Sequence, residues 1–268
     1  MGVVCAFFRR DFQNQVSYRL SFVLQILGIF PIVLMFFFLS RLVDGNEISG
    51  VLRQYGGMYF PFVLIGISIQ NYLTMAMNTF SASIRDSQLS GTLEAIMATP
   101  VSVPAFLAGS TAYSFVFNSF RILIYFGFGL LLFHFTLEWS RIPLGLLIMI
   151  LTITAFSSLG IFSASFIIFF KKGDPVNWLV NVASWLLGGV YYPVAILPEW
   201  LQKIAFAIPM THTLESFRLT LLGGQGLYDI RNHMLALLAW TVIGLPLSCF
   251  CFNYALNRSR RQGTIGHY

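Results

Sequence analysis

Charged side chains are scarce in this sequence. They make up only 10% of its 268 residues, whereas soluble globular domains carry about 25% charged residues. Apolar residues account for 57%, and apolar runs of about the length that crosses a bilayer recur along the whole chain. This composition excludes an ordinary soluble domain. It predicts an all-α polytopic membrane protein that forms a single domain over residues 1–268.

The apolar runs predict six membrane-spanning helices. They cover about residues 20–43, 57–80, 105–133, 143–170, 176–192 and 234–256. Each approaches or exceeds the ~20 residues that cross ~30 Å of hydrocarbon, although the fifth is short. Residues 193–215 consist of apolar pieces too short to cross, broken by three prolines. We interpret them as two half-helices that dip into the membrane and turn back; a helix on the outer surface is the alternative.

Groups that carry out catalysis or bind metals are also sparse. The sequence has three cysteines and four histidines, at Cys5, Cys249, Cys251, His134, His212, His233 and His267. None of the histidines lies at metal-ligand spacing from another, and no acidic residue falls within a predicted span. We therefore expect no catalytic residue and no metal site. No basic cluster exceeds three residues, so nucleic-acid binding is not expected either.

The basic residues orient the chain in the membrane. Six spans place both termini on one side, together with residues 81–104 and the loop 171–175. That side holds nine lysines and arginines, whereas the other holds six, spread over more residues. Cytoplasmic loops carry the excess of such residues. Both termini, the tail 257–268 and the segment 81–104 are therefore predicted to be cytoplasmic.

The cytoplasmic segment DSQLSGTLEAIMATPVSV, which begins at Asp86, is longer than a simple connection needs. Leu89, Leu93, Ile96 and Met97 share one helical face, and Pro100 ends the pattern. The segment 86–100 is therefore predicted to form a short amphipathic helix along the membrane. Its periodicity alone leaves two roles open: packing on lipid headgroups, or docking to a soluble partner.

The same segment resembles the signature of ABC-2-type permeases, the membrane subunits of one class of ATP-binding-cassette exporters. The matching residues are Gly91, Thr92, Leu93, Glu94, Thr99, Pro100, Val101 and Ser102. The resemblance covers essentially the whole chain, because residues 1–19 are similar to the family's cytoplasmic interface helix and residues 193–215 to its extracellular re-entrant hairpin. The hairpin resemblance rests on Pro193, Pro198, Pro209 and Arg218, and implies that these residues form an extracellular gate.

The resemblance implies that the chain works with separate ATPase subunits. The chain has no G-x-x-x-x-G-K-[ST] phosphate loop. We therefore expect it to bind no cofactor, and we expect two copies of a partner ATPase to bind ATP and Mg²⁺. The segment 86–100 is then a coupling helix. Its predicted ATPase-coupling residues are Gly91, Thr92, Leu93, Glu94, Ile96, Met97, Thr99 and Pro100.

The resemblance further implies an exporter in the bacterial inner membrane, in contact with membrane lipids. It would act as a homodimer, or as a heterodimer with a second permease. Hydrophobic drugs, lipids and lipid-linked glycans are the candidate substrates. A secondary transporter or channel without an ATPase is the alternative. Such proteins usually carry ionisable residues inside their spans, whereas Arg121 is the only charged residue near the middle of a predicted span in this sequence.

Arg121 lies near the middle of the third predicted span. A central arginine costs roughly 2.5–3.5 kcal/mol on insertion scales, so it needs a reason to be there. Asn118 lies nearby on the same span, and Asn71 lies on the second span. These three residues either line a substrate pathway, where Arg121 would attract an anionic group, or have a structural role in the bundle.

Overall fold

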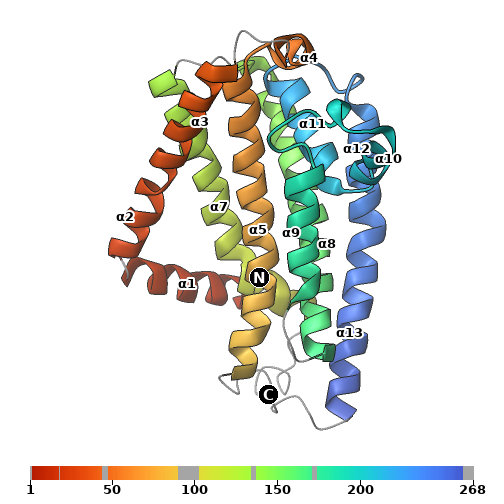
Figure 1. Cartoon of the computed structure of the whole chain (residues 1–268). Helices are drawn as coiled ribbons and strands as arrows, with labels where there is room; N and C mark the ends of the chain where they lie inside the picture. The colour runs from red at the N-terminus through yellow and green to blue at the C-terminus, as the bar shows by residue number, and fades with distance from the viewer. Residues whose placement is uncertain are drawn as a thin grey trace.

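The computed structural model is a bundle of long helices (Figure 1). It describes residues 2–17, 19–43, 48–89, 103–133, 137–170 and 174–261. Every regular element within these ranges is helical, so the predicted all-α class is confirmed. Helices suit a lipid environment because each satisfies its own backbone hydrogen bonds.

Five segments in the described part of the chain have the length and composition of membrane spans. They are Val23–Val43, Tyr59–Ser83, Thr111–Leu131, Trp139–Phe170 and Arg231–Ser259. They correspond to the first four predicted spans and the sixth. The fifth predicted span, residues 176–192, corresponds to α9 (Pro175–Leu187), whose thirteen residues reach only about 20 Å. A sixth crossing therefore stays a prediction.

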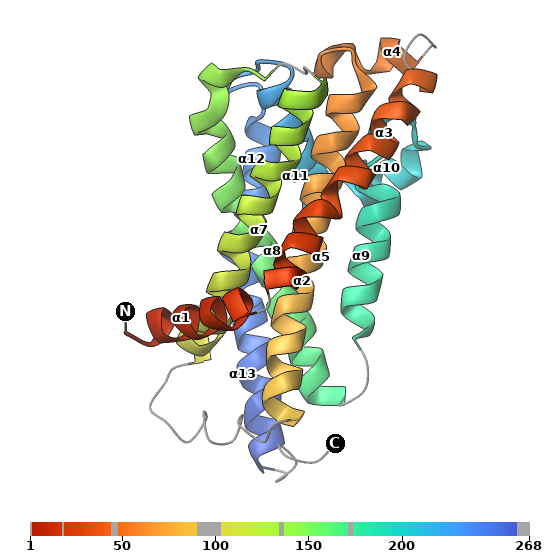
Figure 2. The ribbon, with the colours of Figure 1, turned by 90° about the vertical axis from the view of Figure 1, so that its left-hand side faces the viewer.

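The first predicted span consists of two helices rather than one. α2 (Arg19–Leu27) and α3 (Ile29–Val43) are separated at Gly28, and α1 (Gly2–Ser17) lies crosswise to the bundle at their start (Figure 2). A helix is thus present where the sequence predicts the N-terminal interface helix. The side of the membrane on which it lies remains a prediction.

α1 is held against the first half of α7 (Val103–Phe133). The Phe7 ring covers Gly109, where an added Cβ atom would lie 3.0 Å from the ring. Phe8 and Phe12 both meet Tyr113 edge-on, with ring centroids 5.6 and 6.3 Å apart. α1 is thus held beside the first half of α7, the helix that directly follows the predicted coupling segment in the sequence.

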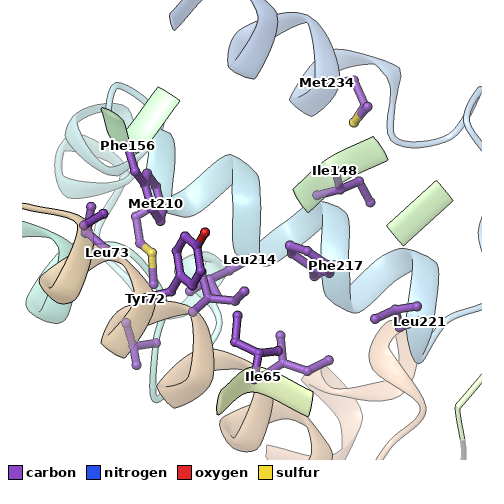
Figure 3. Close-up of a cluster of buried hydrophobic side chains, with 14 of the residues drawn as sticks. Ile65, Tyr72, Leu73, Ile148, Phe156, Met210, Leu214, Phe217, Leu221 and Met234 are labelled. Atoms are coloured by element: carbon purple, nitrogen blue, oxygen red, sulfur yellow. The ribbon is translucent and has the colours of Figure 1, made fainter. Parts of the chain in front are cut away.

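α5 (Tyr59–Leu89) is the central helix of the bundle. It packs against α3, α7, α9, α8 (Ile142–Phe170) and α11 (Pro209–Leu221). Tyr72 of α5 lies beside Met210 and Leu214 of α11 in the largest apolar cluster, to which α8 contributes Phe156 (Figure 3). Burial of these large side chains fixes α11 against α5 and α8.

The predicted coupling segment is only partly covered. Residues 86–89 are the last turn of α5 rather than the start of a separate helix. All eight predicted ATPase-coupling residues, Gly91, Thr92, Leu93, Glu94, Ile96, Met97, Thr99 and Pro100, lie outside the described residues. Their arrangement therefore stays a prediction.

The predicted hairpin region consists of three short helical elements. They are η3 (Val194–Ile196), α10 (Glu199–Ala205) and α11. Pro193 and Pro198 immediately precede the first two, and Pro209 opens α11, where its missing N–H has little cost. All but two of the thirteen residues of α11 are buried. We call this end of the bundle, which also contains α4 (Ile48–Val51) and η1 (Arg53–Tyr55), the hairpin end.

The last span runs from the hairpin end to the opposite end, which we call the tail end (Figure 1). It comprises α12 (Arg231–Ala239), a π-helical turn at Trp240–Gly244 and α13 (Leu245–Arg261). At the π turn, Thr241 Oγ1 lies 2.8 Å from Thr154 Oγ1 of α8. The irregular turn thus remains joined to the bundle by a polar contact.

Candidate functional site

Arg218 of α11 is fully buried at the hairpin end, with 1% of its surface exposed. Its Nε and Nη2 atoms donate to the carbonyl oxygen of Phe62 on α5, at 3.1 and 3.0 Å. Nη1 donates to the Gly189 carbonyl at 2.7 Å, and Nη2 to the Val190 carbonyl at 2.9 Å. The guanidinium also stacks 3.4 Å from the Phe62 ring centroid. One side chain thus ties α11 both to α5 and to the turn after α9.

A second buried contact strengthens the same junction. Glu215, one turn before Arg218 on α11, accepts a hydrogen bond of 2.8 Å from the Tyr55 hydroxyl. Burial raises the pKa of Tyr55, and the neighbouring Glu215 raises it further, so the phenol stays protonated and donates. Tyr59 donates to the Tyr191 carbonyl at 3.0 Å. The segment that leads into α5 is therefore bonded to the hairpin at several points.

The four predicted gate residues divide into two kinds. Pro193, Pro198 and Pro209 mark where the short helices begin, as described above. Arg218 instead fastens the hairpin to α5, and its guanidinium is directed at backbone carbonyls rather than at a carboxylate. A gating role for the four residues stays a prediction, but the structure identifies Arg218 as the central tie of the region.

Two of the three predicted pathway residues, Asn71 and Arg121, lie where α5 and α7 pack together. Asn71 of α5 donates to the Tyr125 hydroxyl of α7 at 2.9 Å. One turn later on α5 and one turn earlier on α7, Arg121 Nη1 lies 3.8 Å from the sulfur of Met75. Arg121 is partly exposed and is the central residue of the span Thr111–Leu131. The third residue, Asn118, is buried and bonds within its own helix, to the Ser114 carbonyl at 2.8 Å.

A track of polar side chains joins α5 to α9. Considering each predicted span separately did not reveal these contacts. Thr74 Oγ1 donates to Asn181 Oδ1 at 2.6 Å, and Asn177 Nδ2 donates to Asn78 Oδ1 at 2.8 Å. Asn181 in turn donates to the Asn177 carbonyl at 2.9 Å. The signal was present in the sequence, since these residues recur every four positions on each helix. We call these four residues the polar track.

The polar track ends at Asp174, the N-cap residue of α9. Its Oδ1 atom accepts a hydrogen bond of 3.0 Å from the Asn177 backbone N–H. The hydroxyls of Ser81 on α5 and Ser163 on α8 also donate to its two carboxylate oxygens. Asp174 therefore fixes the start of α9 to both neighbouring helices.

One edge of the polar track remains open. Asn78 is exposed, Thr74 and Asn181 are partly exposed, and all three lie where α5 runs beside α9. In Figure 1, α5 lies between α3 and α9. Among the described residues, large apolar side chains are exposed along α3, α7, α8, α9 and α13. The open polar edge is therefore an unusual feature at membrane depth, where polar groups mark functional positions.

Comparison with known sequences identifies the architecture. The family model of the ABC-2 type transporter matches residues 3–222, which include the hairpin, the polar track and the predicted coupling segment. The chain belongs to the ABC-2 type transporter family. It is therefore a transmembrane component of an ABC transporter and an integral membrane protein. Members of this family generally work with ABC ATPase partners.

Curated relatives agree with this assignment. The inner membrane transport permease YadH of Escherichia coli strain K12 is 24% identical over 184 residues, which cover 68% of this chain and 71% of the relative. The YadH proteins of Escherichia coli O157:H7 and Shigella flexneri match to the same extent. The ABC-2 assignment drawn from the GTLE…TPVS motif is thus confirmed.

Proposed function

We propose that this chain is the transmembrane subunit of an ATP-driven exporter, which dimerises and carries two separate ATPase subunits on its cytoplasmic side. The observation that carries the proposal is the family match over residues 3–222. The sequence contains no phosphate loop, so ATP and Mg²⁺ bind in the partner. The chain contributes the pathway, the coupling segment and the outer hairpin.

Coupling to the ATPase is assigned to residues 91–100, with Glu94 as the polar anchor and Leu93 on the apolar face that the sequence pattern predicts. Two features support this role. The segment is flanked by α5 and α7, the two helices that carry Asn71, Tyr125 and Arg121. α1 also packs on the first half of α7. A push on the segment would therefore reach both the pathway helices and the interface helix.

Variants of the coupling segment test the proposal. We expect Leu93→Asp and Glu94→Ala to reduce co-purification of the ATPase, and to abolish the stimulation of its turnover by the permease, because each removes a docking contact. Asn232→Ala, an exposed residue of α12 at the hairpin end, is the control and should leave both unchanged. Normal assembly and turnover in both segment variants would contradict the docking role.

The pathway is assigned to the side of α5 that lies between α3 and α9. The open edge of the polar track supports this placement, because in a dimer two such edges would face a common cavity. Arg121 and Asn71 lie on the adjoining α5–α7 packing surface. Apolar surroundings with a narrow polar edge suit an amphipathic cargo. Hydrophobic drugs, lipids and lipid-linked glycans all have this character.

Cysteine accessibility tests the pathway. In a chain whose three native cysteines are replaced by serine, we expect Asn78→Cys to react with a hydrophilic maleimide, because water reaches the pathway. Phe250→Cys on α13 is the control, because the Phe250 side chain is 68% exposed and lies at a similar depth to Asn78. The similar depth follows from the neighbours of the two residues: Cys249, next to Phe250, and Phe80, two residues after Asn78, line one cavity between the helices. Phe250→Cys should not react, because it faces lipid. Equal labelling of both positions would remove the support for this pathway.

A further inference from the structure

Two histidines far apart in the sequence meet at the hairpin end. His212 of α11 and His233 of α12 face each other, with their Nδ1 atoms 3.0 Å apart and their ring centroids 5.2 Å apart. Both side chains are only half-buried. Neither belongs to the polar track or to the junction around Arg218, and the proposed transport mechanism uses neither.

The hydrogen bonds of the pair define how the two rings are held. His212 Nε2 lies 2.8 Å from the Phe206 carbonyl oxygen, which can only accept, so Nε2 carries the hydrogen. In the neutral ring, His212 Nδ1 is therefore a bare acceptor, and His233 Nδ1 donates to it. The carbonyl of Phe206 thus fixes both the orientation and the tautomer of His212, with its Nδ1 lone pair directed at His233.

His212 is held in the way that metal-binding histidines are held. A ligating imidazole almost always donates its second N–H to a carbonyl or carboxylate, which orients the ring and increases its basicity. Two imidazole nitrogens, each about 2.0–2.1 Å from one Zn²⁺ ion at ligand angles of about 90–109°, lie roughly 2.9–3.4 Å apart. The observed 3.0 Å falls within that interval. Loss of the shared hydrogen and a rotation of the rings would direct both lone pairs at one ion.

We propose that His212 and His233 form a binding site for a divalent transition-metal ion of the imidazole-preferring class, such as Zn²⁺, Ni²⁺ or Cu²⁺. Water completes the coordination at this half-buried position. The bound ion replaces the Nδ1–H···Nδ1 hydrogen bond and joins α11 to α12. It thereby fastens the buried hairpin helix to the start of the last span. The proposal departs from the expectation that the histidines form no site, because spacing along the chain does not reveal a pair 21 residues apart.

Zinc binding to the purified full-length chain tests the proposal. The protein is prepared in detergent through an affinity tag that contains no histidine, stripped with a chelator and titrated with ZnCl₂ by calorimetry. We expect one ion per chain, and a thermal unfolding midpoint that rises with Zn²⁺ concentration, because a ligand of the folded state stabilises it. His212→Ala should weaken binding at least about tenfold, since loss of even an outer partner of a ligand typically costs 10–100-fold.

Two further variants keep the test decisive. His233→Asn retains an N–H group that can donate to His212 but removes an imidazole ligand, so it should fold normally and lose the zinc response. His267→Ala removes a histidine of the C-terminal tail and should retain the zinc response. Zinc affinity in His233→Asn equal to that of the unmodified chain would overturn the proposal, as would the absence of binding to the unmodified chain. None of these readouts depends on transport or on the ATPase.

Discussion

Arg218→Met is expected to destabilise the protein strongly. Methionine fills a similar elongated volume but donates no hydrogen bond, so the Gly189 and Val190 carbonyls lose their partner in a buried setting. Each unsatisfied buried group costs about 1–3 kcal/mol, which gives roughly 2–6 kcal/mol for the two. The stacking of the guanidinium on Phe62 is lost as well. Because the tie joins α11 to α5, we expect the whole hairpin to loosen.

The thermal unfolding midpoint of the purified protein measures this effect. For a chain of this size, the expected loss corresponds to a fall of roughly 5–20 °C. Arg231→Met is the matched control, since Arg231 is an exposed arginine of α12 at the same end of the bundle, stacked on Tyr228. It should change the midpoint little. A midpoint for Arg218→Met as high as that of the control would show that the carbonyl contacts contribute little.

Arg218→Lys separates charge from geometry. An ammonium group keeps the positive charge but presents donors at a single point, whereas the guanidinium reaches three carbonyls with a planar fork. We therefore expect an intermediate loss of stability. A midpoint equal to that of the unmodified protein would mean that charge alone stabilises the junction.

The long helices could be predicted from the sequence because their apolar runs are continuous. The third span was expected at residues 105–133, and α7 covers Val103–Phe133; the fourth was expected at 143–170, and α8 covers Ile142–Phe170. Hydropathy cannot show where a continuous run bends. For this reason the prediction missed that the first span is two helices, which separate at Gly28. It also missed that the apolar stretch 176–192 contains the thirteen-residue α9 followed by the turn that Arg218 binds.

The polar contacts could be predicted only in part. Arg121 and Arg218 were identified, since a charge in an apolar setting or in a family motif is conspicuous in one sequence. Their partners were not, because Phe62 is 156 residues from Arg218 and Met75 is 46 residues from Arg121. The polar track was missed as well, because Asn78 and Asn177 are 99 residues apart and a neutral polar residue gives little signal on its own. Their contacts can be recognised only in the structure, where α5 packs against α9 and α11.

Gly66→Ala is the second substitution with a large expected effect. Gly66 lies on α5 directly beneath the turn after α9, and an added Cβ atom would lie 2.1 Å from the Val190 carbonyl oxygen and 2.7 Å from Arg218 Nη2. Real carbon–oxygen contacts do not approach so closely, so the turn must move away. That movement also stretches the hydrogen bond from Arg218 to Val190. Overpacking and the weakened bond together should cost about 3 kcal/mol or more.

Gly127→Ala provides the control for helix propensity. Gly127 lies within α7, where an added Cβ would have no atom within 4 Å. Alanine favours a helix over glycine by about 1 kcal/mol, so this variant should be unchanged or slightly more stable. A Gly66→Ala variant that behaves in the same way would contradict the close approach of α5 to the turn.

Combining the two substitutions tests whether they act through one contact. If Gly66→Ala destabilises by displacing the Val190 carbonyl from Arg218, then removal of Arg218 has already lost part of that free energy. The fall in midpoint for Gly66→Ala/Arg218→Met should therefore be smaller than the sum of the two single falls, by the equivalent of about 0.5–3 kcal/mol. Strict additivity would mean that the glycine and the arginine hold the hairpin independently, and that α5 is not fastened at the single point where Gly66, Val190 and Arg218 meet.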